Sequence, residues 1–350
     1  PYTPILRVTA KRTQAQLLET TLLNIINFQT MIATKASRVA QAANGAKVVD
    51  FGLRRAQEED AGMKGARAAY IGGAVATSNV KAGKEYGIPI AGTHAHSFVM
   101  SFPTELDAFR AYVKTFPENA TLLIDTYDTV QGARNAAIVA KELVQQGKKL
   151  GAVRLDSGDL LDLSQKVRKI LDEEGLQYVK IFASGDLNEY KIAELVKNKA
   201  PIDGYGVGTE LITAKPVAAI AGVYKLVEDG DGAKIKLSPG KQTCPGKKQV
   251  YRISDAAGNY SHDVLALEGE CREGTPLLEL IVQDGKRTKE RRNLTEIQRH
   301  ALDCVAKLPE YVKQVRVETS YCVEISSRLQ KLVGKLTERY ANNHLGGEAA

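Results

Sequence analysis

Between about residue 47 and residue 210, short apolar segments alternate with segments of helical period. The six apolar segments end in small or acidic residues, and we expect strands at 47–52, 88–93, 121–128, 151–159, 179–186 and 202–209. Their apolar residues are continuous rather than alternating, which is typical of strands buried on both faces, and so of a parallel sheet covered by helices. The pattern predicts a (β/α) barrel or a doubly wound sheet and does not separate the two.

The segments on either side of this region have a different character. Residues 14–34 predict one long, mostly buried helix. After the alternating region we expect two hairpins, one at 223–238 with its turn at 229–232 and one at 248–265 with its turn near 258–259. Two charged helices are expected to follow, at 293–306 and 318–341. We therefore predict three regions. Residues 1–35 are a remnant of an N-terminal region with the long helix, residues 36–225 form a catalytic (β/α) barrel domain, and residues 226–350 form a smaller α+β region.

Composition narrows the classes of protein and partner. The net charge is +7, but basic and acidic residues are interspersed, and aromatic residues make up only 6% with no Trp, so we expect no nucleic-acid surface. No apolar run is long enough for a transmembrane helix, so we expect no membrane partner. The four cysteines are scattered, as in reduced thiols of a cytoplasmic protein. The chain opens without Met or a leader, which suggests a processed or truncated start.

Three late strand ends are rich in glycine and hydroxyl groups. The sequences DSGD and ASGD repeat Ser-Gly-Asp 27 residues apart, and GVGT follows in the next unit. The serines are candidate N-caps, and the glycines permit tight turns close to a ligand. Free N–H groups at helix N-termini favour anions, so these turns predict a phosphate site unless they are ordinary helix starts. The residues concerned are Ser157, Gly158, Ser184, Gly185, Gly206, Gly208 and Thr209.

Acidic side chains are dense at the same strand ends. Asp125 and Asp156 end apolar segments, where burial makes a helix-cap role less natural. Asp128 and Asp159 come three residues later and can cap the following helices. Carboxylates at these positions can hold sugar hydroxyls, a histidine or Mg²⁺, and Asp159 is the candidate metal ligand.

Two of the five histidines, His94 and His96, follow the segment 88–93. His-x-His at the end of a barrel strand is a pattern of metal-dependent amidohydrolases, but such a site needs further histidine or cysteine ligands. The other histidines, at 262, 300 and 344, lie outside the alternating region. We therefore favour one working histidine oriented by an acid from the next unit, Asp125.

Several long motifs occur in an order that resembles the nicotinate phosphoribosyltransferase family. They are DFGLRRAQ, AAYIGGAVATSNVKAG, GTHAHSFVMSF, LLIDTYDT, VRLDSGDL, ASGDLNEYKI, IDGYGVGT and VYKLVE…KLSPGKQTCPGKKQVYR, within a resemblance that runs to about residue 330. It implies an α/β fold, the irregular (β/α) barrel of type II phosphoribosyltransferases, with a smaller α+β region from the chain ends. It also implies ATP-coupled synthesis of nicotinate mononucleotide from nicotinate and phosphoribosyl pyrophosphate with Mg²⁺, in NAD biosynthesis, by a homodimer with shared active sites.

The resemblance implies a role for each motif residue. His96 would accept a phosphoryl group from ATP and become a phosphohistidine, Asp125 would orient its ring, and His94 would be a tolerated neighbour. Phe51 would stack on the pyridine ring, and Arg54 would approach its carboxylate or the pyrophosphate.

The remaining implied roles concern phosphate and ribose. Arg154 and Asp156 would face the substrate, with Asp156 on the ribose hydroxyls. The 5′-phosphate would be held by Ser184, Gly185, Gly208 and Thr209. Basic side chains of SPGKQTCPGKKQ would bind ATP or pyrophosphate, namely Lys241, Lys247 and Lys248.

Two departures from the family pattern leave alternatives open. The family's N-terminal segment, with a TDxYxLTM-type motif that reaches the partner's site, is absent here, and Ala76 stands where the family usually has Gly. The alternatives are a nicotinamide-using relative, the quinolinate enzyme, or an inactive fragment that only binds phosphate ligands. The quinolinate enzyme lacks the ATP-linked histidine, so GTHAHS argues against it.

Overall fold

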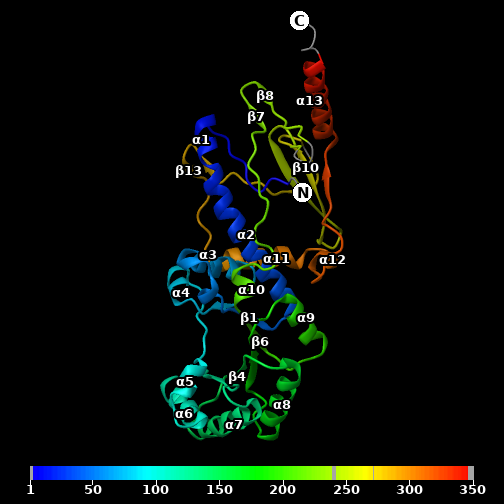
Figure 1. The fold of residues 1–350 in the computed structure, drawn as a ribbon. Coiled ribbons are helices and arrows are strands. Elements are labelled where there is room, and N and C mark those ends of the chain that lie inside the picture. The colour runs from blue at the N-terminus through cyan, green and yellow to red at the C-terminus, as the bar shows by residue number, and fades with distance from the viewer. Residues whose placement is uncertain (1–2, 239–241, 271, 346–350) are drawn as a thin grey trace. The chain divides into compact units, whose positions relative to one another are not determined.

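A six-stranded parallel sheet lies at the centre of the alternating region, in a computed structural model that describes residues 3–238, 242–270 and 272–345. Its strands are β1 (Lys47–Asp50), β2 (Ala76–Thr77), β3 (Thr121–Leu123), β4 (Ala152–Leu155), β5 (Lys180–Ala183) and β6 (Gly204–Val207). They are ordered β2-β1-β6-β5-β4-β3, and every pair is parallel (Figure 1). This is the cyclic strand order of a barrel, and in the described part of the chain it is open between β2 and β3.

Helices between the strands bury the sheet. The fully buried side chains include strand residues such as Leu122, Leu155, Ile181 and Tyr205. The helices and the 3₁₀ turn of this region are η1 (Leu53–Arg55), α3 (Glu58–Ile71), α4 (Val80–Tyr86), α5 (His96–Met100), α6 (Glu105–Thr115), α7 (Thr129–Gln145), α8 (Leu160–Glu173), α9 (Glu189–Lys197) and α10 (Thr209–Ile212). The helices α7 and α8 end shortly before Gly147 and Gly175, and both glycines have the positive φ that is common after a helix C-terminus. The predicted α/β fold with a parallel sheet is therefore confirmed.

The predicted strand at 88–93 is wrong. Ile90 forms only an isolated bridge with Thr77, and the two-residue strand β2 occupies this edge of the sheet. Pro89 has no N–H to donate to a ladder, which favours an edge segment with few backbone hydrogen bonds. A strand as short as β2 carries no period that the sequence could display.

The single helix predicted over 14–34 is also wrong in its limits. Two helices are present, α1 (Arg12–Leu17) and α2 (Glu19–Ala42), separated at Leu18. The buried residues of α2 all lie in its second half, from Ile32 onward.

The chain divides into two compact units, which we call the sheet unit and the terminal unit. The sheet unit is Asn27–Ile220 with Asn293–Leu302, and the terminal unit is Pro1–Ile26, Ala221–Arg292 and Asp303–Ala350. The sheet unit thus takes in residues 27–35 and 293–302, which the predicted domain ranges assigned elsewhere. Both stretches lie almost wholly in helices, α2 and α11 (Leu294–Ala306), whose other residues belong to the terminal unit.

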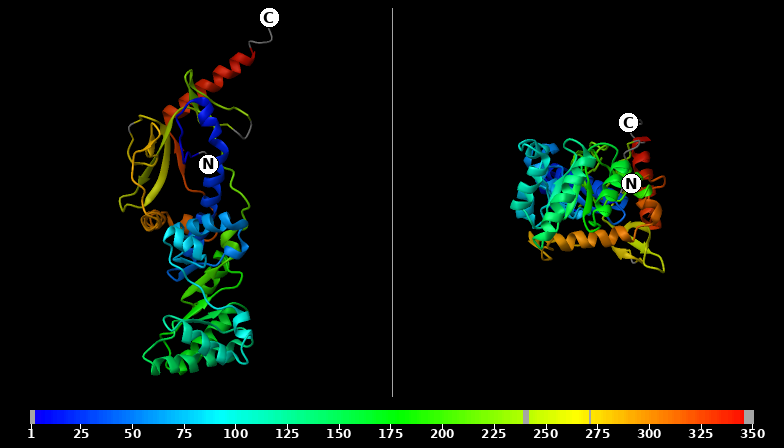
Figure 2. Two further views of the ribbon diagram at one scale, coloured as in Figure 1. Left: turned by 90° about the vertical axis from the view of Figure 1, so that its left-hand side faces the viewer. Right: turned by 90° about the horizontal axis from the view of Figure 1, so that it is seen from below.

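The terminal unit contains both predicted hairpins. A four-stranded sheet has the order β11-β9-β10-β14, and β10 packs against α13 through a core of Val250, Leu265 and Leu329 (Figure 2). The predicted helix over 318–341 is only partly correct, because strand β14 precedes α13. The elements of this unit are β7 (Glu228–Asp229), β8 (Gly232–Ala233), β9 (Lys248–Ser254), β10 (Tyr260–Leu267), β11 (Thr275–Pro276), β12 (Val282–Gln283), β13 (Lys286–Arg287), α12 (Glu310–Lys313), β14 (Val323–Ile325) and α13 (Ser327–Leu345).

No helix in the described residues combines the length and the apolar character needed to cross a membrane.

Candidate active site

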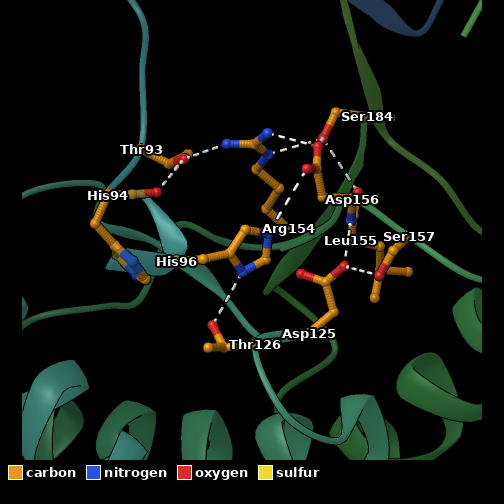
Figure 3. A network of polar contacts seen from close by, with 10 residues as sticks. All are labelled: Thr93, His94, His96, Asp125, Thr126, Arg154, Leu155, Asp156, Ser157 and Ser184. Atoms are coloured by element: carbon orange, nitrogen blue, oxygen red, sulfur yellow. Dashed lines mark hydrogen bonds and ion pairs between the residues drawn. The ribbon is translucent and has the colours of Figure 1, made fainter. Parts of the chain in front are cut away.

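Polar side chains from several strand ends meet in one network at the carboxyl edge of the parallel sheet (Figure 3). Arg154 lies at its centre, on β4. Its guanidinium donates to Thr93 Oγ1 at 2.7 Å, to Ser184 Oγ at 2.8 Å and to Asp156 Oδ1 at 2.6 Å. One side chain therefore joins the ends of β4 and β5 to the segment that carries the two histidines.

Asp156 is the anionic partner in this network. Its Oδ1 accepts hydrogen bonds from Arg154 and from Ser184 Oγ, and its Oδ2 lies 3.7 Å from His96 Nε2. Burial alone would raise the pKa of Asp156, but the hydrogen bonds from Ser184 and Arg154 and the charges of Arg154 and His96 outweigh it and lower the pKa. Asp156 is therefore a carboxylate at neutral pH.

His96 is held at the open side of the network, in the first turn of α5. Its Nδ1 lies 3.1 Å from Thr126 Oγ1, and its side chain is 40% exposed. A ring fixed at one nitrogen and accessible at the other is suited to act as a nucleophile or base.

The predicted pairing of His96 with Asp125 is wrong. Asp125 Oδ2 accepts from the backbone N–H of Asp156 at 2.9 Å and from Ser157 Oγ at 2.6 Å. Successive side chains beyond a strand point in opposite directions, so Asp125 faces the end of β4, and Thr126 faces the histidine. Asp125 Oδ1 is buried and has no hydrogen-bond partner among the described residues, which leaves an oxygen available for a ligand.

The two histidines do not form a ligand pair. His94 is buried and points away from His96, so that its Nε2 accepts a hydrogen bond from the backbone N–H of Leu123 at 3.1 Å (Figure 3). Within the described ranges, no group of three or more His, Cys, Asp or Glu side chains is arranged to hold a metal ion. The role of a tolerated neighbour that we expected for His94 is also wrong, because its nitrogen completes a backbone hydrogen bond.

Two aromatic rings form the floor of the site. Phe51 follows β1 and lies 5.8 Å from Phe182 of β5, centroid to centroid, with the Arg154 guanidinium 5.1 Å from the Phe51 centroid. The glycines of β6 make room for both rings, since a Cβ at Gly206 would lie 2.6 Å from Phe51 and one at Gly204 would lie 2.8 Å from Phe182. The flat surface suits an aromatic base.

The glycine-rich turns present unpaired backbone donors. In the described part of the chain, the N–H groups of Gly185, Asp186, Gly208 and Thr209 donate no hydrogen bond. Gly185 has φ +94°, and a Cβ there would lie 2.0 Å from the carbonyl oxygen of Asp156. Clustered free N–H groups of this kind bind anions.

The predicted serine caps are wrong. The N-caps are Asp159 for α8 and Asn188 for α9, while Ser157 and Ser184 bond to the carboxylates. The Oδ1 atom of Asp159 accepts from the N–H groups of Leu161 and Asp162, so the carboxylate serves as a helix cap. Its role as a metal ligand stays a prediction.

Three other predicted residues form no hydrogen bond or ion pair with this network in the described part of the chain. Arg54 is exposed and has no hydrogen bond or ion pair among the described residues. Lys247 belongs to the terminal unit, where it pairs with Glu228 at 3.3 Å. Lys248 is buried and donates to the carbonyls of Cys244 and Gly246.

Lys241 lies outside the described residues.

Sequence reasoning missed Thr93, Thr126 and Phe182. Thr93 and Thr126 stand in the motifs GTHAHS and DTYD, beside residues that were predicted, but which way they point depends on the sheet. Phe182 lies inside an apolar strand and gives no sign of a site role.

Comparisons with known proteins show the family to which the chain is similar. The model of the nicotinate phosphoribosyltransferase (NAPRTase) family matches residues 46–226, and the model of the nicotinate phosphoribosyltransferase C-terminal domain matches residues 271–333. The chain is 43% identical to nicotinate phosphoribosyltransferase of Bacillus subtilis, with 92% of this chain and 72% of the relative covered. It is 42% identical to nicotinate phosphoribosyltransferase pncB2 of Mycobacterium tuberculosis, with 96% and 72% covered.

A solved structure is similar as well. The crystal structure of human nicotinic acid phosphoribosyltransferase matches with a TM-score of 0.79 at 29% identity, over 92% of this chain and 77% of that chain.

Proposed function

The chain belongs to the nicotinate phosphoribosyltransferase family, and from this premise we propose that it joins nicotinate to the ribose of phosphoribosyl pyrophosphate. The products are nicotinate mononucleotide and pyrophosphate, in a step of NAD biosynthesis. The observation that carries the proposal is the arrangement at one sheet edge of free backbone donors, an aromatic floor and the Arg154–Asp156 pair.

The parts of the site suit the parts of the substrates. The free N–H groups of the turns at 185–186 and 208–209 are suited to the 5′-phosphate. The rings of Phe51 and Phe182 are suited to the pyridine ring, and Arg154, which lies over Phe51, offers positive charge to its carboxylate. Asp156 and the free oxygen of Asp125 can accept hydrogen bonds from the ribose hydroxyls.

The chemistry needs charge stabilisation rather than proton transfer. The bond from ribose C1′ to pyrophosphate breaks, and the pyridine nitrogen forms a new bond to C1′. In the transition state, positive charge develops on the ribose. The carboxylates of Asp156 and Asp125, which belong to the polar network, are suited to stabilise this charge. The site also raises the rate of the reaction by holding both substrates in one fixed geometry.

We further propose that His96 accepts a phosphoryl group from ATP. The bond between the γ-phosphorus and the bridging oxygen breaks, a nitrogen–phosphorus bond forms, and ADP leaves. The ring is suited to this role, because Thr126 holds Nδ1 and leaves Nε2 as the open nitrogen. The phosphate would add negative charge next to Asp156, which would alter the affinity for the anionic substrate and product.

Mg²⁺ is proposed to enter with phosphoribosyl pyrophosphate and with ATP. It prefers carboxylate oxygens, and the unpartnered Asp125 Oδ1 fits such an ion. The bound ion would neutralise charge on the leaving pyrophosphate.

We also propose a homodimer. Large apolar side chains near the site are exposed in the single chain, with Ile90 at 55%, Met100 at 65% and Tyr127 at 67%. A second copy that covered this surface would bury them, which favours association.

The test of the His96 role is an assay of pyrophosphate release with nicotinate, with and without ATP. Wild-type enzyme should be stimulated by ATP, whereas His96→Ala should keep ATP-independent turnover and lose the stimulation. His262→Ala, which changes a histidine of the terminal unit, is the matched control and should respond as wild type does. Stimulation of His96→Ala by ATP would remove His96 from the proposal.

A further inference from the structure

The segment that carries His96 lies in the gap between the two edge strands of the sheet. On one side it is attached to β2 by backbone hydrogen bonds, from Thr77 N to the Pro89 carbonyl at 3.0 Å and from Ala91 N to the Thr77 carbonyl at 3.1 Å. Beyond Ala91 the segment leaves β2. Figure 1 shows it as a long run of chain between α4 and α5.

On the other side, a side chain takes the place of a strand. The backbone N–H of Ile124 donates to the Arg154 carbonyl at 3.1 Å, and so points toward β4. Neighbouring residues of a strand direct their N–H groups to opposite sides, so the N–H of Leu123 points into the gap. There it donates to Nε2 of His94 at 3.1 Å.

The imidazole is fixed in this position by its surroundings. Its ring centroid lies 5.5 Å from that of Phe98, 5.9 Å from that of Phe109 and 4.7 Å from that of Tyr112. His94 is only 7% exposed. Because Nε2 accepts a hydrogen bond, the ring is neutral and carries its proton on Nδ1.

The residues on either side of His94 contact the site. Thr93 Oγ1 accepts from Arg154 and donates to the His94 carbonyl at 3.0 Å, and His96 begins α5 two residues later. A shift of His94 would therefore move both Thr93 and His96 relative to the Arg154–Asp156 pair.

We propose that His94 is a positioning residue, which closes the gap in the sheet through the Leu123 N–H and so holds His96 where it accepts the phosphoryl group. The second half of this statement rests on the proposed phosphorylation of His96. The first half concerns the backbone of β3 alone and is tested separately.

Two variants separate the hydrogen bond from the packing. His94→Phe keeps an aromatic ring and removes the acceptor, whereas the side-chain oxygen of His94→Gln takes nearly the position of Nε2. Phe98→Leu is the matched control, because it changes the packing around the ring and leaves the acceptor. Two quantities are measured for each: hydrogen exchange of the Leu123 amide, and the rate at which ATP phosphorylates His96, with the KM for phosphoribosyl pyrophosphate alongside.

Because one hydrogen bond is lost in His94→Phe, the Leu123 amide should exchange its hydrogen about fivefold faster than in wild type. The rate at which ATP phosphorylates His96 should fall about fivefold. The KM should not change, and His94→Gln should restore both rates to within about twofold. Phe98→Leu should leave both rates near wild type.

Unchanged exchange at Leu123 in His94→Phe would overturn the proposal, as would equal phosphorylation rates in the Phe and Gln variants. If wild-type enzyme is not phosphorylated, the proposed role of His96 fails, and the exchange of Leu123 alone decides the role of His94.

Discussion

At the scale of single residues, the turn that we propose to bind phosphate depends on the absence of a side chain at Gly185. Its φ of +94° is unfavourable for other residues, and an added Cβ would lie 2.0 Å from a backbone oxygen that cannot move aside. We predict that Gly185→Ala loses about 2–4 kcal/mol of unfolding free energy and raises the KM for phosphoribosyl pyrophosphate. Chemical denaturation and steady-state kinetics measure the two effects.

Gly175→Ala is the control for this prediction. Its φ is +74°, but no atom lies within 4 Å of an added Cβ, so only the backbone strain remains. It should cost about 1 kcal/mol and leave the KM unchanged. Equal costs at the two glycines would contradict the clash with Asp156.

The second residue-scale prediction concerns acid stability. Burial lowers the pKa of His94 from 6.5 to about 4, and the charges of Arg154 and His96 add to this effect. In the unfolded chain the ring takes up a proton near pH 6.5, so its contribution to stability is complete above that pH and is lost as the pH falls toward 4. Between pH 7 and pH 5, wild type should lose about 2 kcal/mol more than His94→Phe does.

Unfolding free energies at the two pH values measure this difference. Phe98→Leu is the control, since it changes the packing around the ring but removes no titratable group, and it should keep the acid loss of wild type. Parallel acid losses in wild type and His94→Phe would show that His94 is not buried as a neutral ring.

The sequence predicted many of the residues that form the site, but it did not predict which of them contact each other. His96, Asp156, Ser184 and Gly185 were expected at one sheet edge because parallel strands end together, and they are found there. The partner of His96 was not predictable, because a shift of one residue along β3 exchanges Asp125 for Thr126. Phe182 and the free N–H groups depend on how neighbouring strands pack, which no local pattern records.

At the scale of elements, Asp159 begins α8, and its carboxylate binds two N–H groups of the first turn. We predict that Asp159→Ala loses about 1 kcal/mol of unfolding free energy, as is usual for an N-cap. The Mg²⁺ concentration at half-maximal activity should not change. Asp128→Ala removes the corresponding cap of α7 and should cost about the same. A changed Mg²⁺ requirement in the Asp159 variant alone would show that Asp159 is a metal ligand.

A buried ion cluster joins three helices of the sheet unit. Lys35 of α2 donates to Glu189 of α9 at 2.5 Å and to the Lys215 carbonyl at 2.6 Å, and lies 3.7 Å from Glu210 of α10. The helices α9 and α10 follow the two turns proposed to bind phosphate. Without the lysine, Glu189 keeps only the more distant Arg38, at 3.6 Å, and Glu210 keeps Lys215, at 3.2 Å. The buried Glu189 loses its closest cation, so Lys35→Met should cost about 3 kcal/mol and raise the KM for phosphoribosyl pyrophosphate.

Lys180→Met tests whether burial of the ion cluster is the reason for the large loss of stability expected in Lys35→Met. Lys180 pairs with Asp203 at 2.9 Å, but both side chains are at the surface. Its loss should cost less than about 1 kcal/mol. If the two lysine variants unfold at similar denaturant concentrations, the Lys35 cluster is not a determinant of the fold.

Elements with strong local signals could be predicted, and short ones could not. Five of the six expected strands and both hairpins are present, because continuous apolar runs and glycine-containing turns determine structure locally. The segment 88–93 has the composition of a strand, yet Pro89 and the long connection to α5 leave it as a bridge. Its attachment to β3 through a side chain is a tertiary contact and has no sequence signature.

At the scale of the whole molecule, the cyclic order of six parallel strands brings residues from 51 to 209 to one edge of the sheet. The sequence alone did not separate a barrel from a doubly wound sheet, because both alternate strands and helices. The pairing of β1 with β6 decides this point, since the first and last strands are neighbours only in the barrel order. The resemblance to the family, which rests on all the motifs together, implied the barrel.

We propose that this edge of the sheet transfers phosphoribosyl groups to nicotinate. The direct measurement is pyrophosphate release from phosphoribosyl pyrophosphate by the whole chain, with nicotinate, with nicotinamide and without a base. We predict release that depends on nicotinate, is weak or absent with nicotinamide, and is accompanied by an equal amount of nicotinate mononucleotide. Release that is the same with and without nicotinate, or no release at all, would show that the chain does not transfer phosphoribosyl groups to nicotinate.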